Sequence, residues 1–584
     1  MRAPRDVSFP VLSLCRLPPM PTNVVLAQEG DLEPGQMKQV TVEGAAGDVD
    51  LLLARTASGA YRATHAYCSH YGAPLAGGAL SGERVVCPWH HACFHLEDGR
   101  QVEPPGQDGL PAFDVRAEEG DVIVTLPDDI PDEVPASMTG RRGPSGGEER
   151  VAVVLGGGAA GAYAAEGLRE EGFDGRVVMI TADLFRPYDR INLSKAYLAG
   201  SIAQAGDLVL RTPDFYEERD IELRKGRSVE HVEAQEGRLT FANGETMDFD
   251  RLVLAPGGTP RELDVDGRGL EGVHTLRATG DSDAIHKAAK DARHAVVVGA
   301  SFIGMECASS LRQISEEAGT DLSVTVVAPD AVPFAPVLGE AVGGMLRELH
   351  EEHGVAFRLE EHVTALHGAG SQPDHAERVQ QVELENGDTL PADLVVVGIG
   401  VDPATSFVEG VEKADDGGIV VDEQLRARFP GSATQRDPAT PDSVFAAGDV
   451  AQFPYWLASG APTRIEHWRL ACQHGRLAGR NAAGAGERYR SVPYFWTAQH
   501  GMNLRYVGHA AAFDEVIIEG DLGEREFAAY YVQGGRVVAA SGSGRDRALA
   551  AFEELLRRQE VPAPAEIADV DLVELLRAAG EEEA

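Results

Sequence analysis

Lysine is scarce in this sequence, and the chain lacks any basic stripe or cluster. Only six of the 52 basic residues are lysine, and the 93 acidic residues bring the formal net charge to −41. A protein that binds nucleic acid needs clustered positive charge to neutralise phosphates. We therefore expect no nucleic acid partner and interpret the acidity as a solvated surface, which would suit a high-salt cytoplasm.

Long apolar runs are also missing. The sequence contains no stretch of about 18 apolar residues, the length that a helix needs to cross a membrane, and its first residues hold no continuous apolar segment of the kind found in export signals. We expect no membrane span and a cytoplasmic location. No pattern can be assigned before Met20, and the first strand-like run begins at Asn23, so Met20 is a candidate for the true start.

Cysteine is rare, and its spacing excludes two further classes. The six cysteines lie too far apart to form a disulfide framework, which indicates a reducing compartment. No Cys-x-x-Cys occurs, so dithiol–disulfide reductase chemistry is disfavoured. For Cys307, packing in a core is the expected role.

The chain of 584 residues is too long for one core, and its texture divides it into several domains. From about residue 23 to 126, short strand-like runs alternate with Gly and Pro turns, which predicts a small all-β domain. Residues 127–150 are rich in Pro, Gly and charge, which is typical of a linker that lets the first domain move. From Val151 onward, buried strands alternate with Gly turns and helices, which predicts α/β architecture.

Two short motifs in the first domain carry metal-ligand chemistry. Cys68-Ser-His70 is followed, after sixteen residues, by Cys87-Pro-Trp-His90. Two thiolates and two imidazoles can hold the two irons of a [2Fe-2S] cluster, although four such ligands can also hold a structural zinc. The surrounding segments, YGAPL after the first pair and CPWHHACF around the second, resemble the Rieske family. That resemblance favours the cluster over zinc.

The Rieske resemblance also has departures. High-potential members carry an extra disulfide at the positions of Ala73 and Trp89, so this domain resembles the lower-potential, ferredoxin-like branch. His91 stands where the family usually has glycine, which puts the backbone conformation there in question. His95 is interpreted as an ordinary structural or surface histidine.

Two glycine-rich fingerprints follow buried strands. Val151 to Leu155 leads into Gly156-x-Gly158-x-x-Gly161, and His294 to Val298 leads into Gly299-x-Ser301-x-x-Gly304. Such turns bring a pyrophosphate to the N-terminus of a helix, where free N–H groups and partial positive charge favour it. Two dinucleotide sites in one chain point to a flavin and a nicotinamide.

From about residue 151 to 560, the chain resembles the pyridine nucleotide-disulfide oxidoreductase superfamily, in the branch of ferredoxin reductases and apoptosis-inducing factors. The motifs that carry the resemblance are PYDRINLSK, LVLAPGG, GASFIGME, VFAAGDV, RIEHW and VPYFW. With the Rieske domain in front, the arrangement is similar to the Rieske-bearing, apoptosis-inducing factor 3-like proteins. The resemblance implies FAD, a [2Fe-2S] cluster and NAD(P)H.

The implied architecture is a multidomain one: an all-β Rieske domain, two Rossmann-like α/β domains with the second inserted in the first, and a small α+β C-terminal domain. The expected boundaries are a Rieske domain at 22–127, a linker at 128–150, an FAD domain at 151–275 and 402–488, an NAD(P)H domain at 276–401, a C-terminal domain at 489–565 and a tail at 566–584.

The resemblance assigns roles to individual residues. For the metal centre these are Cys68, His70, Cys87 and His90. For the cofactors they are Gly156, Gly158, Gly161, Arg190, Gly299, Ser301, Gly304, Gly448, Asp449, Glu466, His467 and Trp468. Lys195, Glu306 and Trp496 are the implied catalytic residues: Glu306 would face the nicotinamide and pair with Lys195, whose cation favours electron density at the flavin. Trp496 would border the flavin ring, or it is a plain core aromatic.

Some positions leave the interpretation open. The acid that usually ends the second strand of a dinucleotide fold is replaced by Ala182 in the FAD half, with Asp183 next to it, and by Ala328 in the NAD(P)H half. NADH and NADPH therefore both remain possible. The spacing of His350 and His353 does not match a zinc-binding H-E-x-x-H motif, and we expect a solvated helix face there.

The expected function is an oxidoreductase that passes electrons from NAD(P)H through FAD to the Rieske cluster and on to a one-electron acceptor protein. One alternative is a redox-responsive signalling protein with slow turnover, which fits the apoptosis-inducing resemblance. A terminal Rieske oxygenase is disfavoured, because its Asp-x-x-His-x-x-x-x-His iron motif does not occur. A homodimer is possible, and the sequence does not identify the acceptor.

Overall fold

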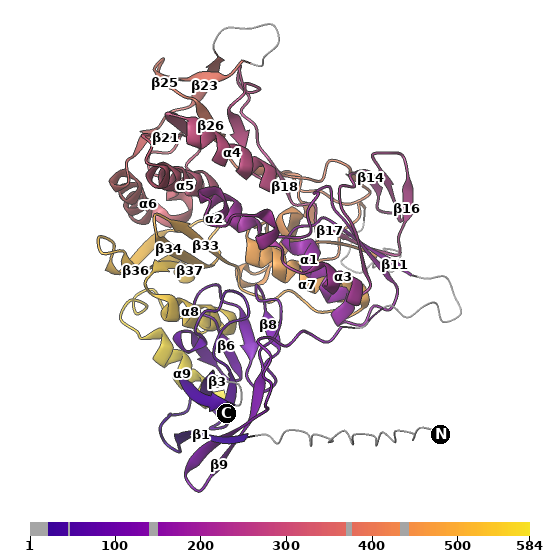
Figure 1. Ribbon diagram of the computed structural model, residues 1–584, viewed down its shortest axis with the longest axis vertical. Helices are drawn as coiled ribbons and strands as arrows, with labels where there is room; N and C mark the ends of the chain where they lie inside the picture. The colour runs from indigo at the N-terminus through magenta and orange to yellow at the C-terminus, as the bar shows by residue number, and fades with distance from the viewer. Residues whose placement is uncertain are drawn as a thin grey trace, which may run out of the picture.

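The computed structural model describes residues 22–44, 47–138, 140, 150–368, 377–431 and 443–583. The candidate start at Met20 lies outside this range. The molecule is elongated (Figure 1). The first domain lies at one end, and the third domain, at about residues 273–397, lies at the other. No helix among the described residues is both long and apolar enough to cross a membrane.

The first domain is all-β, as the sequence predicts. Its larger sheet has the order β1-β10-β9-β4-β3-β2, and a smaller sheet has the order β5-β6-β7-β8. The strands are β1 (Thr22–Gln28), β2 (Gln36–Gly44), β3 (Gly47–Arg55), β4 (Tyr61–His65), β5 (Ala79–Ser81), β6 (Arg84–Val86), β7 (Cys93–His95), β8 (Gln101–Glu103), β9 (Ala112–Glu118) and β10 (Asp121–Leu126). The loops after β4 and β6 hold the Cys and His pairs.

The second domain is a Rossmann-like layer built on a parallel sheet of order β13-β12-β11-β17-β30. Its strands are β11 (Val151–Leu155), β12 (Arg176–Ile180), β13 (Ile221–Arg224), β17 (Arg251–Leu254) and β30 (Val444–Ala446). Helices α1 (Ala159–Glu170) and α7 (Trp468–Ala483) pack against each other unusually closely. A Cβ atom at Gly475 would lie 2.1 Å from the Ala160 carbonyl oxygen, so only glycine permits this approach.

The third domain is built on a second parallel sheet, of order β19-β26-β20-β21-β22. In the sequence, this domain is inserted between β17 and β30 of the second domain. Its strands are β19 (Val273–Thr275), β20 (His294–Val298), β21 (Ser323–Ala328), β22 (Val355–Leu359) and β26 (Leu394–Val397), and its helices are α4 (Thr279–Asp291), α5 (Phe302–Ala318) and α6 (Ala335–Glu352). Strand β30, which follows this insertion in sequence, completes the first sheet beside β17. The two dinucleotide-type folds are therefore nested as expected.

The last domain is an antiparallel sheet of order β33-β34-β37-β36-β35 with two helices. It consists of β33 (Tyr494–Gln499), β34 (Met502–Gly508), β35 (Glu515–Asp521), β36 (Glu526–Gln533), β37 (Arg536–Ser543), α8 (Asp546–Arg558) and α9 (Leu572–Glu583). The helices α8 and α9 contact strand β5 of the first domain, and Figure 1 shows them beside the strands of that domain.

Three local expectations need correction. Residues 566–584 are not a plain tail, because α9 buries Leu572 and Leu576 on the helical i, i+4 spacing. The start of the expected linker is attached to the first domain, since Gly109 and Val134 exchange two backbone hydrogen bonds. The solvated-face interpretation is wrong for His350, which is fully buried and contacts Gln499 and His500.

Candidate functional site: a flavin pocket joined to an iron–sulfur centre

The four metal-ligand candidates converge at the end of the first domain. The side chains of Cys68 and Cys87 are buried and hydrogen-bonded to each other. The Nδ1 atoms of His70 and His90 lie 3.1 Å apart. Burial lowers the pKa of His70 to about 4 and that of His90 as well, so both imidazoles are neutral, the form that binds metal. The two thiols thus lie together, and so do the two imidazoles. Two thiolates and two imidazoles are the donor set that fits a [2Fe-2S] cluster.

His91, which stands where the Rieske family usually has glycine, adopts a backbone conformation that favours glycine. Its φ angle is 56°, in the left-handed region that favours glycine. The side chain is fully buried and stacks on the Tyr494 ring with centroids 4.3 Å apart. Its Nδ1 atom lies 2.5 Å from the Glu553 carboxylate. A histidine is therefore used here because its side chain binds the C-terminal domain.

A cavity of about 940 Å³ opens where the second, third and last domains meet. Its glycine-rich wall begins at Gly156, whose φ of 127° only glycine adopts easily and where a Cβ would lie 2.0 Å from the Ala255 carbonyl oxygen. Gly161 packs on Gly156 in the same way, whereas Gly158 faces open space at the start of α1. This cradle at a helix N-terminus fits the pyrophosphate of a dinucleotide.

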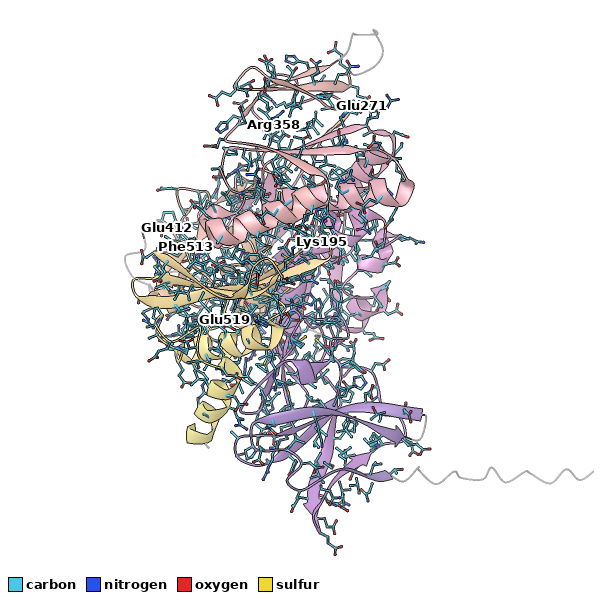
Figure 2. All side chains as sticks on the ribbon, turned by 90° about the vertical axis from the view of Figure 1, so that its left-hand side faces the viewer. Lys195, Glu271, Arg358, Glu412, Phe513 and Glu519 are labelled. Atoms are coloured by element: carbon cyan, nitrogen blue, oxygen red, sulfur yellow. The ribbon has the colours of Figure 1, made fainter. Side chains whose placement is uncertain are left out.

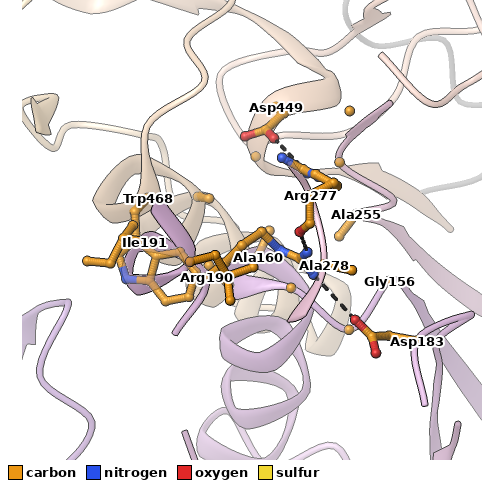
Figure 3. Close-up of a pocket in the computed structure, with 18 of the residues that line it drawn as sticks. Gly156, Ala160, Asp183, Arg190, Ile191, Ala255, Arg277, Ala278, Asp449 and Trp468 are labelled. Atoms are coloured by element: carbon orange, nitrogen blue, oxygen red, sulfur yellow. Dashed lines mark hydrogen bonds and ion pairs between the residues drawn. The ribbon is translucent and has the colours of Figure 1, made fainter. Parts of the chain in front are cut away.

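Charged side chains border one end of this cavity, as Figure 3 shows. The Arg190 guanidinium donates to the Arg277 carbonyl and lies 3.8 Å from the Asp183 carboxylate. Arg277 lies 3.4 Å from Asp449, which follows Gly448 at a turn with φ 74°. Asp183 thus borders the cavity even though the preceding strand ends in Ala182.

The N-terminus of α7 closes another side of the cavity. Glu466, His467 and Trp468 all line it, and Arg464 pairs with Glu466 at 2.6 Å. Burial lowers the pKa of His467 to about 3, and its Nδ1 atom has no hydrogen-bond partner among the described residues. A buried, unpaired ring nitrogen at a helix N-terminus is available to a polar ligand such as the flavin ring.

The three expected catalytic side chains lie together in the middle of the molecule, where Figure 2 labels Lys195. Lys195 Nζ is 2.8 Å from Glu306 Oε2, and both residues are nearly buried. The Lys195 ammonium also lies 5.1 Å from the centre of the Trp496 ring. All three residues line the cavity. Trp496 is partly buried; it lines the cavity and also packs against the hydrophobic cluster of the last domain.

Two of the four expected cluster ligands also line this cavity. His70 and His90 line it together with Gly156 and Lys195. The His90 and Trp496 rings are 4.8 Å apart between centroids. The glycine-rich wall and the two expected histidine ligands therefore border a single space, with Trp496 between His90 and Lys195.

The second glycine fingerprint forms the same kind of tight turn before α5 in the third domain. Gly299 has a φ of 103°, and a Cβ at Gly304 would lie 2.2 Å from the Gly299 carbonyl oxygen. The Ser301 hydroxyl caps α5 by accepting from the Gly304 N–H and donates to the Gly398 carbonyl. Phe302 and Ile303, at the start of α5, reach the cavity beside Glu306. This helix start can receive a nicotinamide dinucleotide.

Sequence reasoning missed several contacts that build the site. Arg469 donates to the His91 carbonyl at 2.7 Å and to Glu553 at 2.8 Å; we call Arg469, Glu553 and His91 the docking anchor. Thr497 donates to Glu306 Oε1 at 2.7 Å, and Ser194 donates to Oε2 at 2.5 Å. These contacts join residues 84 to 378 positions apart in the chain, and no local motif marks them.

Three family models match the chain. The Pyridine nucleotide-disulphide oxidoreductase model matches residues 150–475, the Rieske [2Fe-2S] domain model matches residues 22–114, and the Reductase C-terminal model matches residues 494–576. The first implies FAD and NAD(P)H, and the second implies a [2Fe-2S] cluster. The zinc alternative for the Cys and His pairs is thereby dropped.

The chain is also similar to individual proteins. Apoptosis-inducing factor 3 of Mus musculus is 36% identical over 538 residues, which cover 90% of this chain and 82% of that protein. Rhodocoxin reductase of Rhodococcus erythropolis is 32% identical over 420 residues, which cover 72% of this chain and 92% of that protein. The crystal structure of a ferredoxin reductase from Rhodopseudomonas palustris is 30% identical with a TM-score of 0.65, covering 73% of this chain and 99% of that one.

The nested α/β folds, the joined cavity and these matches agree with one another. The chain therefore belongs to the pyridine nucleotide-disulphide oxidoreductase family, as an NAD(P)H-dependent FAD oxidoreductase of the ferredoxin reductase type that carries its own Rieske domain.

Proposed function

We propose that this protein oxidises NAD(P)H and passes the electrons internally, from its flavin pocket to its own Rieske centre, before a one-electron acceptor protein receives them. The observation that carries the proposal is the joined cavity, which His70 and His90 share with Gly156 and Lys195. When bound, FAD converts a two-electron donation into single-electron steps and the cluster carries one electron.

Each group of residues has a defined part in this proposal. Gly156, Gly158 and Gly161 would hold the FAD pyrophosphate at the N-terminus of α1, with Arg190 and Asp449 along the cofactor. His467 and Trp468 would border the flavin ring. Cys68, Cys87, His70 and His90 would hold the cluster. The start of α5 would receive the nicotinamide dinucleotide.

The catalytic residues would act through charge and exclusion of water. The Lys195 ammonium, oriented by Glu306, would favour the negative charge that arrives with the electrons. Trp496 would exclude water between the flavin and His90, because its ring contacts His90 on one side and lies under Lys195 on the other. This arrangement gives the indole a role that a core aromatic lacks.

The Rieske domain is held in place in this proposal and does not swing on a linker. The docking anchor is buried and joins three domains: His91 from the first, Arg469 from the second and Glu553 from the last. Arg211 adds a second connection, since it pairs with Asp108 of the first domain at 2.6 Å and with Glu166 at 2.8 Å. A buried charge network of this kind is costly to break.

The partner and the setting are proposals as well. Relatives named as reductases of ferredoxins or rhodocoxin support an iron–sulfur or other one-electron protein as the acceptor. The described cysteines are unpaired, which supports a reducing compartment such as the cytoplasm. A homodimer and the choice between NADH and NADPH remain predictions.

An anaerobic titration tests the relay. The purified protein receives NADH or NADPH, and flavin absorbance and the EPR signal of the reduced cluster are followed in the same samples. The proposal predicts that the flavin bleaches and a Rieske signal appears. If the flavin bleaches while the cluster stays oxidised, the internal relay is wrong. Very slow turnover with a long-lived charge-transfer band would favour the redox-responsive signalling alternative.

A further inference from the structure

Behind Glu306, on the side away from the cavity, a line of hydrogen bonds runs to the surface. Thr497 Oγ1 lies 2.7 Å from Glu306 Oε1, and Gln499 Nε2 lies 3.0 Å from Thr497 Oγ1. His350 Nε2 lies 2.8 Å from Gln499 Oε1, and His500 Nε2 lies 3.1 Å from His350 Nδ1. Thr497, Gln499 and His350 are all fully buried.

Side chains of strand β33 point alternately to its two faces, and this alternation determines where the line of hydrogen bonds runs. Tyr494 and Trp496 point to one face, where they contact Trp89 and His90 of the Rieske domain. Thr497 and Gln499 point to the opposite face, toward α5 and α6. One strand therefore contacts the cluster loops with one face and the partner of Lys195 with the other.

The direction of every hydrogen bond in the line follows from the charge on Glu306. An ionised carboxylate only accepts, so the single Thr497 hydrogen goes to Glu306, and the Thr497 oxygen must accept from the Gln499 amide. The Gln499 oxygen then faces His350, which must carry its hydrogen on Nε2. His350 Nδ1 is left to accept from His500.

The imidazoles of His350 and His500 are both neutral, so each ring carries its hydrogen on one nitrogen only. Burial lowers the pKa of His350 to about 4 and that of His500 to about 3. The groups around the pair are His353 directly after α6, Arg312 from α5 and Arg525 from the turn after β35. Glu352 pairs with Arg525. A neutral imidazole donates through one nitrogen only.

The line transmits polarisation and does not conduct protons. An amide nitrogen has no lone pair with which to accept a proton, so Gln499 blocks transfer from Thr497 toward His350. Aligned hydrogen bonds in a buried environment instead strengthen one another. The line can therefore hold Glu306, but it cannot serve as the route by which a proton leaves.

We propose that Thr497, Gln499 and His350 are positioning residues that hold Glu306 as a fixed anion and thereby fix the Lys195 ammonium at the flavin side of the cavity. The Ser194 hydroxyl and the Lys195 ammonium bind Glu306 Oε2, and the line binds Oε1, so the carboxylate cannot rotate. The consequence for electron transfer rests on the proposed function, whereas the polarity of the line does not.

The substitution Glu306→Gln tests the polarity. Ser194 and Lys195 both donate toward the Oε2 position, so the new amide must place its oxygen there and its NH2 toward Thr497. Thr497 then accepts from residue 306 and donates to the Gln499 oxygen. The side-chain amide of Gln499 therefore flips and points its NH2 group toward His350. His350 must then accept at Nε2 and carry its hydrogen on Nδ1. A change at position 306 thus reverses a tautomer three hydrogen bonds away.

The measurement is ¹⁵N NMR of the full-length protein labelled at histidine, with His350→Gln used to assign the signal. We expect the Nε2–H tautomer of His350 in the wild type and the Nδ1–H tautomer in Glu306→Gln. The matched control is Ser541→Ala, which removes a buried hydroxyl of β37 that is bonded to Tyr531 instead, and it should leave His350 unchanged. An Nδ1–H tautomer in the wild type, or the same tautomer in both proteins, would overturn the proposal.

A kinetic measurement tests the positioning role. Thr497→Val should lower the rate constant for flavin reduction by NAD(P)H by roughly tenfold, with little change in KM, because it removes a donor to Glu306 and not a substrate contact. His350→Gln should have a smaller effect of the same kind, and Ser541→Ala should have none. A change in KM alone, or equal rates in all three variants, would contradict the role.

The two experiments separate this inference from the proposed function. The tautomer is read without electron transfer, and the flavin rate is read without the cluster. If the flavin fails to reduce the cluster, the relay is wrong while the tautomer result still decides the inference. If Thr497→Val fails to fold, the wild-type tautomer alone can still overturn the inference.

Discussion

The Rieske domain meets the rest of the chain in two regions that differ in chemistry. At the contact centre, His70 and His90 meet Trp496, and the groups that touch are neutral aromatic rings. Around it lies the docking anchor, where Arg469, Glu553 and His91 form a buried charged network. The contact centre is where electrons would cross, whereas the anchor holds the domains together.

The difference teaches how a chain can keep two redox centres in contact. Buried ion pairs are specific in geometry and strongly destabilising when one partner is lost, so they suit a permanent attachment. Neutral rings around a cluster leave its charge to be set by its own ligands and hydrogen bonds. Changes in the anchor should therefore affect stability first, and changes in the contact centre should affect the rate of electron transfer first.

The largest effect is expected from Glu553→Gln in the anchor. Arg469 would remain buried without its counter-charge, a change that costs about 3–5 kcal/mol in comparable sites. Equilibrium unfolding in denaturant measures the loss. The matched control is Glu526→Gln, whose carboxylate is 62% exposed and pairs with Arg545, and it should cost less than about 1 kcal/mol. Equal losses in the two variants would show that the anchor does not hold the domain.

The second effect is expected at low pH, which should lower the contribution of the docking anchor to the unfolding free energy. Burial alone would raise the pKa of Glu553 and Glu554, but neighbouring guanidinium groups, Arg469 for the first and Arg84 for the second, hold both below the usual value. The unfolded chain therefore binds protons first, so their contribution is present above about pH 4.3 and is lost as the pH falls below it. Unfolding free energies measured between pH 7 and pH 3 should fall less steeply in Glu553→Gln, and identical slopes would contradict this account.

A smaller effect is expected from Trp496→Leu in the contact centre. Removing the ring between His90 and Lys195 should slow reduction of the cluster by roughly tenfold, equivalent to about 1.4 kcal/mol in the barrier, while flavin reduction stays fast. Rapid mixing with NADH under anaerobic conditions separates the two steps. Trp456→Leu provides the control, because Trp456 bonds to the Ser491 carbonyl and lies away from the cavity. A slow cluster step in both variants would remove the special role of Trp496.

The smallest effect is expected from Tyr71→Phe at the edge of the contact centre. The Tyr71 hydroxyl donates to Asp189 and accepts from Asn192, and the ring is 44% exposed. The change removes both hydrogen bonds, but Asn192 also donates to Asp189, so we expect a net cost of about 1 kcal/mol. The unfolding free energy should fall by that amount and the cluster step should keep its rate. A loss as large as that of Glu553→Gln would place Tyr71 in the anchor.

What the sequence could predict was local. Asp121–Leu126 is a strand-like run rich in β-branched residues and forms β10 with those bounds. The ligand spacings and the glycine fingerprints each lie within a few residues. These patterns report the geometry of one turn, strand or loop. The nesting of the α/β domains and the cofactors followed from the resemblance that those motifs carry.

What the sequence could not predict depends on contacts between distant segments. The anchor joins residue 91 to residues 469 and 553, and no periodicity relates them. The acidic neighbours Glu351 and Glu352 predict a solvated helix face at His350. These two neighbours are exposed, but His350 itself is buried. After residue 566, charged residues outnumber the short apolar stripe of α9, so the sequence indicated a tail there. In each case a tertiary partner, absent from the local pattern, decided the environment.

The central claim is that the docked Rieske centre receives its electrons within one molecule. Its most direct test is the rate of cluster reduction, followed by EPR after rapid anaerobic mixing with NADH or NADPH, at several protein concentrations. The account predicts a first-order rate that does not change with protein concentration, because His90 and the flavin pocket share one cavity. A rate that rises in proportion to protein concentration would show transfer between molecules and would contradict it.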